Sequence, residues 1–167
     1  TFLLSKIIPP VGGDTLFANT QKAYEELDSD LKEQIKDLKV VHSAKLPYAD
    51  DGFYATETEK RSMNIITSKE AKKEQIHSLV KVHQETQKKG LFINPVYTSH
   101  IQGFNEEESF LLLSKLYEHM TQEKYIYRHK WKENMLLMWD NRTVMHMAEG
   151  GYDGYDRLLH RITIANS

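Results

Sequence analysis

The sequence predicts a β-rich domain of mixed α and β structure, with helices packed outside its sheets. Short apolar segments bounded by Gly, Pro, Asn and Asp recur along the chain, as expected for many short strands. Helical spacing of apolar residues is confined to three segments, the longest at 105–120. The 167 residues are enough for one domain with a buried core.

The elements can be placed in order along the chain. The chain begins with Thr1, and its first residues already read as a strand, so we expect a fragment, or the ordered part, of a longer protein. Asn19 or Thr20 is expected to cap a first helix, Asp28-Ser29-Asp30 a second, and Asn105 a later helix whose first turn is acidic. The predicted elements are strands at 1–8, 15–18, 79–82, 91–94, 125–131, 135–140 and 158–164, turns at 9–14 and 84–90, and helices at 19–27, 28–38 and 105–120.

Residues 41–75 differ from the rest of the chain. They are mostly polar and lack a clean period, and 45–60 combines Pro47, Gly52 and several acidic residues. Long irregular segments in compact domains are usually functional lids or disordered. We therefore expect a lid or flexible loop at 41–75, and a lid often sets substrate choice.

The composition argues against several classes of partner. The formal net charge is −2, from 22 basic and 24 acidic residues, which favours neither nucleic acid nor an anionic membrane as a partner. No apolar run is long enough to span a membrane, and the chain has no Cys for disulfides or Cys-based zinc sites. A cytoplasmic enzyme acting on a small molecule is the default expectation, and both a monomer and a homo-oligomer fit it.

Two arginines near the end of the chain indicate an anion site. Arg157 and Arg161 are four residues apart in the last predicted strand region, so they can project into one cavity. Two guanidinium groups inside a β-rich core are costly unless an anion meets them. A carboxylate is a natural counter-ion, because Arg binds it through two hydrogen bonds. His146 precedes both arginines and is expected to follow a strand.

Five segments carry the most specific signal in the chain. They are 9–15 (PPVGGDT), 91–95 (LFINP), 125–131 (YIYRHKW), 139–142 (WDNR) leading to His146, and 157–161 (RLLHR). Each segment alone is weakly specific, but together they span nearly the whole chain. In this order they resemble the taurine dioxygenase family, most closely the branch that contains 2,4-dichlorophenoxyacetate dioxygenase.

The resemblance implies a double-stranded β-helix, or jelly roll, with flanking helices. It also implies Fe(II) held by two His and one carboxylate, a facial triad that leaves positions open for 2-oxoglutarate and O₂. Oxidative decarboxylation of 2-oxoglutarate to succinate and CO₂ then accompanies hydroxylation of the substrate. The substrate expected from the resemblance is a small organic anion: a sulfonate, a sulfate ester or an aryloxyacetate.

His146 corresponds to the family's distal His ligand of the metal. The family's other two ligands come from a His-x-Asp or His-x-Glu motif upstream of the 9–15 segment, and this sequence begins after that place. We therefore expect the N-terminal part of the domain to be absent, and this chain alone not to hold iron tightly. The triplet His83-Gln84-Glu85 has suitable residue types, but it lies at a strand end and is interpreted as a turn feature.

The resemblance assigns the remaining site residues one by one. Arg157 would pair with the far carboxylate of 2-oxoglutarate, and the Thr15 hydroxyl would bind the same carboxylate. Arg161 would line this pocket and bind either an anionic substrate or the cosubstrate. Trp139 would stand near the iron on the substrate side, and Tyr97 would face the substrate.

Each of several site residues also has a purely structural interpretation. Taken alone, His146 also fits a hydrogen-bonded core residue, Arg157 a surface ion pair, and Trp139 ordinary packing. Asp140 and Asn141 are expected to fix the turn before His146 through side-chain hydrogen bonds to the backbone. The aromatic residues interpreted as sheet core are Phe92, Tyr127 and Trp131.

Two other functions stay open. A jelly-roll protein without catalysis would still bind 2-oxoglutarate or another anion through Arg157 and Arg161. A cupin-like metal enzyme would work without 2-oxoglutarate, and its activity would not need Arg157.

Overall fold

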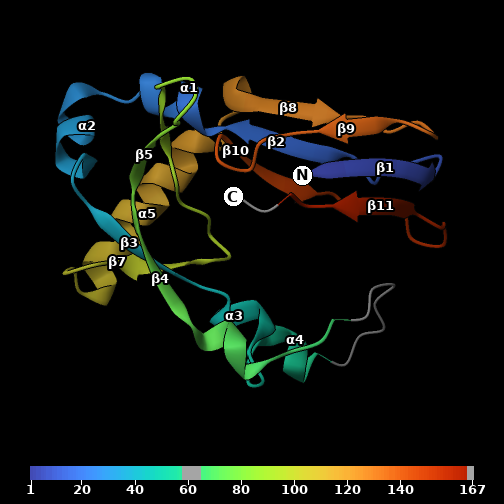
Figure 1. Cartoon of the computed structure of the whole chain (residues 1–167), viewed down its shortest axis with the longest axis horizontal. Helices are drawn as coiled ribbons and strands as arrows, with labels where there is room; N and C mark the ends of the chain where they lie inside the picture. Colours follow the sequence, from blue (N-terminus) through green and yellow to red (C-terminus); the bar gives the residue numbers. More distant parts are fainter. Residues whose placement is uncertain (58–64, 165–167) are drawn as a thin grey trace. The chain divides into compact units, whose positions relative to one another are not determined.

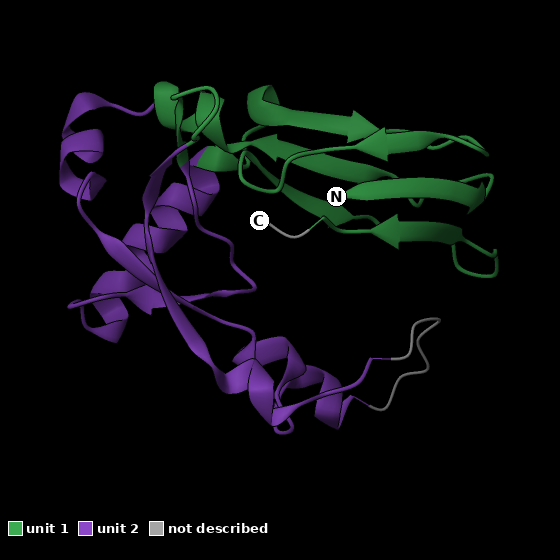
Figure 2. Cartoon of the chain, in the orientation of Figure 1, with its two compact units in different colours: residues 1–26, 83–90, 120–167 green, residues 27–82, 91–119 purple. Residues whose placement is uncertain are grey.

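Antiparallel β-sheets dominate the fold, as the sequence predicts (Figure 1). The computed structural model describes residues 1–57 and 65–164. The chain forms two units, each assembled from separate segments (Figure 2). Unit 1 consists of Thr1–Glu26, His83–Gly90 and Met120–Ser167, and unit 2 of Leu27–Val82 and Leu91–His119.

Unit 1 contains two three-stranded antiparallel sheets. Their central strands, β1 (Phe2–Ile7) and β2 (Thr15–Asn19), are joined by the predicted turn at 9–14, and both strands were expected from the sequence. Sheet A has the order β11-β1-β9, and sheet B has the order β10-β2-β8. The outer strands are β8 (Ile126–His129), β9 (Leu136–Met138), β10 (Val144–Ala148) and β11 (Leu158–Ile162).

The strand register decides which side chains share a face of each sheet. Residues directly opposite one another on antiparallel neighbours project to the same side of the sheet. Three such residues therefore form a row across three strands. The rows that matter for the site are His146–Phe17–Tyr127 in sheet B and Arg161–Leu3–Leu137 in sheet A.

Helix α1 (Thr20–Glu25) begins directly at the end of β2. Asn19 caps it, as predicted, because its side-chain oxygen accepts a hydrogen bond from the Lys22 backbone N–H at 3.0 Å. The Thr20 hydroxyl donates to the Thr143 carbonyl at 2.9 Å, which fixes the helix start beside β10. On a later segment of the chain, the 3-10 turn η2 (Glu123–Tyr125) leads into β8.

The 9–14 turn packs against a second glycine turn that follows β10. The Gly13 N–H donates to the Gly150 carbonyl at 3.0 Å. Gly12 has a φ of +66°, and a Cβ at this position would lie 2.4 Å from the Gly151 carbonyl oxygen. Only glycine permits both the left-handed backbone and this close approach.

Unit 2 combines a third antiparallel sheet with helices. Sheet C has the order β4-β3-β7. The described core residues of this unit that are 0% exposed are Ile35, Val40, Ala49, Leu79, Ile101 and Leu116. The elements of unit 2 and its borders are α2 (Ser29–Ile35), β3 (Lys39–Ser43), α3 (Lys45–Tyr48), α4 (Phe53–Thr56), η1 (Lys69–Lys72), β4 (Glu74–Ser78), β5 (Val80–Val82), β6 (Lys89–Leu91), β7 (Thr98–Ile101) and α5 (Glu106–Met120).

The helix caps of unit 2 are those that the sequence predicts. The Asp28 carboxylate accepts from the Leu31 N–H at 2.8 Å at the start of α2. At the start of α5, the Asn105 side chain accepts from the Glu108 N–H at 2.8 Å, and the Glu108 carboxylate accepts from the Asn105 N–H at 3.1 Å. This reciprocal pair is a capping box. None of the helices in the described part of the chain combines the length and the apolar character that crossing a membrane requires.

Sheet C is the main difference from the sequence-based expectation. Glu74, Gln75 and Ile76 of β4 are all exposed, so this strand shows no alternation of apolar and polar residues. The described part of 41–75 forms short helices and strands rather than one irregular loop, while 58–64 lies outside the described residues. Its role as a lid stays a prediction. The strand expected at 91–94 lies earlier, at Lys89–Leu91.

Gly12→Ala is expected to lower the free energy of unfolding more than Gly154→Ala. Both glycines have a positive φ, which costs an L-residue about 1–2 kcal/mol. A Cβ at Gly154 meets no atom within 4 Å, whereas one at Gly12 collides with the second turn. Urea denaturation measures the free energy of unfolding of both variants, and the difference between them reports the contact between the two turns. Equal destabilisation of both variants would contradict a role for this contact.

Candidate active site

His146 lies in the middle of β10, and not after a strand as the sequence suggests. The centroid of its ring is 6.0 Å from that of Phe17 on β2 and 5.0 Å from that of Trp139. Trp139, which directly follows β9 of sheet A, also contacts Phe17 edge-on at 5.1 Å. Aromatic side chains from both sheets of unit 1 therefore flank this imidazole, while the residue as a whole remains exposed to solvent.

The surroundings of His146 favour a neutral imidazole. Partial desolvation lowers the pKa of His146, and the positive charge of Arg161 on β11 lowers it further. A neutral ring offers the nitrogen lone pair that a metal ion needs. Among the described residues, however, no three His, Cys, Asp or Glu side chains are grouped to hold a metal ion. His146 thus fits one ligand of a metal site, and the described residues do not complete that site.

Thr15 begins β2 and faces the same side of sheet B as Phe17 and His146. It is 3% exposed, and its hydroxyl oxygen accepts a hydrogen bond from Trp131 Nε1–H at 3.0 Å. This bond orients the hydroxyl and leaves its proton available for another acceptor. Thr15 and His146 are diagonal cross-strand neighbours, a relation that corresponds to about 7–8 Å.

Arg157 precedes β11, so strand alternation does not place it beside Arg161 as the sequence-based reasoning assumes. Instead, its Nε–H donates to the Gly13 carbonyl at 3.1 Å, and its guanidinium carbon lies 5.8 Å from the centre of the Tyr152 ring. The glycine turn therefore brings Arg157 next to the segment that leads into Thr15. Its terminal guanidinium nitrogens have no carboxylate partner in the described part of the chain.

Arg161 is the end of the row Arg161–Leu3–Leu137 across sheet A. It is exposed, and no described carboxylate forms an ion pair with it. Its positive charge contributes to lowering the pKa of His146. An anion beside Arg161 would therefore meet a positive charge that no described carboxylate pairs with.

Asp140 fixes the turn before β10, as predicted. Its carboxylate accepts from the Arg142 backbone N–H at 2.8 Å and from the Arg142 side chain at 2.6 Å, and His83 Nε2 lies 3.0 Å from it. The Arg142 guanidinium holds the pKa of Asp140 well below its usual range, with His83 contributing. Arg142 also donates to Glu85 at 3.1 Å. The Arg142 guanidinium thus lies between Asp140 and Glu85. This arrangement supports the interpretation of His83-Gln84-Glu85 as a turn feature.

Asn141 and Trp139 complete this turn. The Trp139 Nε1–H donates to the Asn141 side-chain oxygen at 2.7 Å. The Trp139 backbone exchanges hydrogen bonds with Thr1, at 2.9 Å and 3.0 Å. The indole is therefore held in place beside His146, the position expected for a wall of the substrate space.

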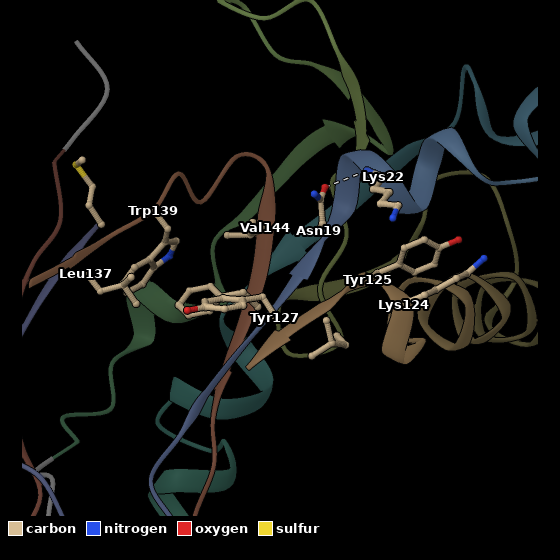
Figure 3. Close-up of a pocket in the computed structure, with 11 residues that line it drawn as sticks. Asn19, Lys22, Lys124, Tyr125, Tyr127, Leu137, Trp139 and Val144 are labelled. Atoms are coloured by element: carbon tan, nitrogen blue, oxygen red, sulfur yellow. Dashed lines mark hydrogen bonds between the residues drawn. The ribbon is translucent and has the colours of Figure 1, made fainter. Parts of the chain in front are cut away.

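Unit 1 contains an aromatic cavity that the sequence does not predict. Tyr127 was interpreted as sheet core, yet it is 59% exposed and lines this cavity of about 410 Å³ together with Phe17 (Figure 3). Side chains alternate along a strand, so Phe17 faces the same side of sheet B as Thr15. This alternation is the sequence feature that identifies Phe17 as a site residue. The lining residues are Phe17, Asn19, Lys22, Lys124, Tyr125, Ile126, Tyr127, Leu137, Met138, Trp139 and Val144.

His129 is a second residue that the sequence did not single out. It lies directly opposite Thr15, and its ring contacts Trp131 at 4.5 Å between centroids. Burial lowers the pKa of His129, which favours its neutral form. Tyr127 Oη lies 3.2 Å from its Nδ1, whereas its buried Nε2 has no hydrogen-bond partner among the described residues. His129 therefore packs behind Thr15 and Trp131.

Tyr97 belongs to unit 2. Its ring stacks on Tyr48 of α3 with centroids 6.3 Å apart, and its carbonyl accepts from the Ser43 N–H at 2.8 Å. The residue is 39% exposed. Its assignment to substrate binding stays a prediction.

Asp140→Asn is expected to lower the free energy of unfolding, because hydrogen bonds to charged groups contribute about 1.5–3 kcal/mol each. Asp153→Asn is the matched control, since Asp153 is exposed and lacks a hydrogen-bond partner within the described ranges. Thermal unfolding of both variants measures the difference. The same small change in both would show that the Asp140 cluster does not hold the turn.

Comparison with known proteins adds an independent observation. The family model described as "Taurine catabolism dioxygenase TauD, TfdA family" matches residues 1–163. The alkylsulfatase of Acinetobacter baylyi is 36% identical over 166 residues, which cover 99% of this chain and 51% of that protein. The 2,4-dichlorophenoxyacetate dioxygenase of Cupriavidus pinatubonensis is 34% identical over 166 residues, with 98% and 54% covered.

Solved structures of similar proteins point to the same family. AAD-2 in complex with Mn(II) and N-oxalylglycine superposes with a TM-score of 0.79 at 32% identity, covering 95% of this chain and 60% of that one. A taurine dioxygenase from Burkholderia xenovorans gives 0.76 at 31% identity, covering 95% and 49%. The chain spans about half the length of the curated relatives named above. It belongs to the TauD/TfdA family of dioxygenases.

Proposed function

We propose that this chain forms part of an Fe(II)- and 2-oxoglutarate-dependent dioxygenase that hydroxylates a small organic acid. The overall reaction consumes 2-oxoglutarate, O₂ and a substrate C–H bond, and gives succinate, CO₂ and the hydroxylated product. The observation that carries the proposal is the Arg157 guanidinium, which lacks a described carboxylate partner and is tied to the turn before Thr15. Two relatives that are 34% and 31% identical to this chain carry the names of 2-oxoglutarate-dependent dioxygenases.

The far carboxylate of 2-oxoglutarate is proposed to bind Arg157 and Thr15. The hydrogen bond to Gly13 uses Nε of Arg157, which leaves the two terminal nitrogens for a paired interaction with a carboxylate. The Thr15 hydroxyl already accepts from Trp131 and would donate its own proton to the same carboxylate. The other end of the keto-diacid would then reach toward His146 along the same face of sheet B.

His146 is proposed to be one ligand of Fe(II), and the remaining ligands would come from residues outside the described ranges. Its strand, β10, is one of the two edge strands of sheet B among the described residues, so a further strand can pair there and place ligands beside the imidazole. Sheets A and B would then be the two faces of a jelly roll. When bound, Fe(II) would supply the redox chemistry that activates O₂.

The substrate is proposed to be a small organic anion that is hydroxylated next to a heteroatom. Such a product is unstable and fragments, which would release sulfite, sulfate or a phenol according to substrate class. Relatives carry names for sulfate ester, sulfonate and phenoxypropionate dioxygenases. Arg161 would bind the acidic group of the substrate or of the cosubstrate, and Trp139 would form a wall near the iron. Tyr97 is proposed to contact the substrate, and the 41–75 segment to act as a lid.

A second candidate function is binding of 2-oxoglutarate without turnover. It is favoured by the lack of three grouped metal-binding side chains within the described residues. The two candidates separate in one experiment: the complete protein is supplied with Fe(II), ascorbate and 2-oxoglutarate, and both binding and succinate release are measured. Binding without succinate formation across the three substrate classes would favour the second candidate.

Arg157→Ala in the complete protein is expected to raise the KM for 2-oxoglutarate sharply. Removing one partner of a buried charge pair costs on the order of 2–5 kcal/mol. Arg157→Lys is the matched control, because it keeps the charge but loses the paired geometry, so its effect should be intermediate. Steady-state succinate release measures both. A KM change below roughly threefold would count against the assignment, and unchanged activity would favour an enzyme that works without 2-oxoglutarate.

His146→Ala is expected to abolish succinate formation and to weaken binding of Fe(II) by the complete protein, because one metal ligand is lost. His160→Ala provides the control, since His160 is an exposed histidine one position from Arg161 on β11 and projects to the other face of sheet A. Equilibrium dialysis with Fe(II) and turnover assays check the pair. Unchanged turnover in His146→Ala would rule out the ligand assignment.

A further inference from the structure

The ring of Tyr152 lies against the charged end of Arg157. The guanidinium carbon is 5.8 Å from the centre of the ring, within the limit of about 6 Å for a cation–π contact. Both side chains are half-buried, and both belong to the loop that joins β10 to β11. Tyr152 is therefore a candidate for setting the orientation of this guanidinium.

The stem of Arg157 is held by the 9–14 turn. Its Nε–H donates to the Gly13 carbonyl at 3.1 Å. A Cβ at Gly13 would lie 3.0 Å from Nε and 3.1 Å from Cδ of Arg157, so the arginine side chain passes directly over this glycine. Gly13 thus fixes the stem of the side chain, while Tyr152 contacts its charged end.

The second glycine turn positions the Tyr152 ring. Gly151 directly precedes this residue and has a φ of +80°, and the Tyr155 N–H donates to the Tyr152 carbonyl at 3.0 Å, which closes a tight turn. The same segment is tied to the 9–14 turn, because the Gly150 carbonyl accepts from the Gly13 N–H at 3.0 Å. One pair of turns therefore holds both the arginine stem and the ring that contacts its end.

These contacts leave the charge of Arg157 available to a ligand. An aromatic face attracts a guanidinium through the quadrupole of the ring, so it neither neutralises the charge nor uses an N–H group. A carboxylate in the same place would compete with an incoming anion. Asp153 and Asp156 lie in the same loop, yet neither forms an ion pair with Arg157 in the described part of the chain. The guanidinium is thus oriented before a ligand arrives, which lowers the entropic cost of binding.

We propose that Tyr152 is a positioning residue for 2-oxoglutarate, because it holds the Arg157 guanidinium in the orientation that meets the far carboxylate. The inference rests on the proposed function and adds a residue that acts through Arg157 rather than by touching the cosubstrate. Tyr152 then sets the affinity for 2-oxoglutarate and leaves the chemical step at saturating cosubstrate unchanged.

Three variants of one loop test the proposal through calorimetric titration of 2-oxoglutarate into the complete protein, loaded with Fe(II) and kept without O₂. Tyr152→Ala removes the ring and is expected to raise the Kd for 2-oxoglutarate roughly five- to thirtyfold, as loss of a partly desolvated cation–π contact would. Tyr152→Phe keeps the aromatic face and is expected to change this Kd by less than about twofold. Tyr155→Ala is the matched control, since Tyr155 is a second tyrosine of the loop, is 53% exposed, and should leave the Kd unchanged.

Steady-state kinetics distinguish positioning from general damage to the loop. Succinate release by Tyr152→Ala is expected to show a raised KM for 2-oxoglutarate with a kcat within about twofold of the wild-type value. A kcat that falls together with the affinity would contradict the positioning role. If Tyr152→Ala does not fold, Tyr152→Leu takes its place, because leucine keeps apolar bulk without an aromatic face.

A double-mutant cycle tests whether Tyr152 acts through Arg157. Arg157→Lys already lacks the planar fork that the ring orients, so adding Tyr152→Ala is expected to raise the Kd for 2-oxoglutarate less than it does in the wild-type background. Equal fold-changes in the two backgrounds would show that the ring acts independently of the guanidinium.

Failure of this inference and failure of the proposed function give different results. A wild-type protein that binds 2-oxoglutarate, with an unchanged Kd in Tyr152→Ala or equal losses in Tyr152→Phe and Tyr152→Ala, would overturn the positioning role and leave the proposed function intact. A wild-type protein that does not bind 2-oxoglutarate would overturn the proposed function, and the role of Tyr152 with it.

Discussion

Packing of two glycine turns is the constraint on which the site depends. Gly12 approaches Gly151 so closely that no side chain fits between them, and Gly13 accepts the Arg157 Nε–H through its carbonyl. The first turn also leads directly into Thr15, and the second follows the strand of His146. One contact therefore fixes the position of a guanidinium, a hydroxyl and an imidazole that are far apart in the sequence.

Antiparallel register supplies the second level of organisation. Pairing of β10 with β2 sets Thr15 diagonal to His146, and pairing of β1 with β11 and β9 sets Arg161 in line with Leu137. Hydrogen-bond partners then refine these positions: Trp131 orients the Thr15 hydroxyl. Arg157 at the glycine turn and Arg161 on sheet A each lack an anionic partner among the described residues, so each guanidinium suits an acidic ligand.

Local signals in the sequence predict local structure well. Asn19, Asp28 and Asn105 cap helices where expected, and Asp140 fixes its turn, because each interaction spans only two or three residues. The β-rich class and most strands of unit 1 follow from short apolar segments, but β10, which carries His146, is not among the predicted strands. The family follows from five motifs in order, and the sequence comparisons bear it out.

Features that depend on pairing between distant segments are not predicted from the sequence. Strand β4 is exposed along its first residues and has no apolar alternation, so only its pairing with β3 identifies it. Tyr127 looks like sheet core because aromatic residues usually are, but its exposure depends on what sheet A places opposite it. Arg157 was assigned to a strand from its spacing to Arg161, whereas the turn contact at Gly13 positions it.

A crystal structure of the complete protein with 2-oxoglutarate or N-oxalylglycine tests the central claim most directly. We predict that the far carboxylate lies within hydrogen-bond distance of both Arg157 and Thr15, with the keto-acid end directed toward His146. A ligand bound elsewhere, or an Arg157 side chain turned away from it, would contradict the account.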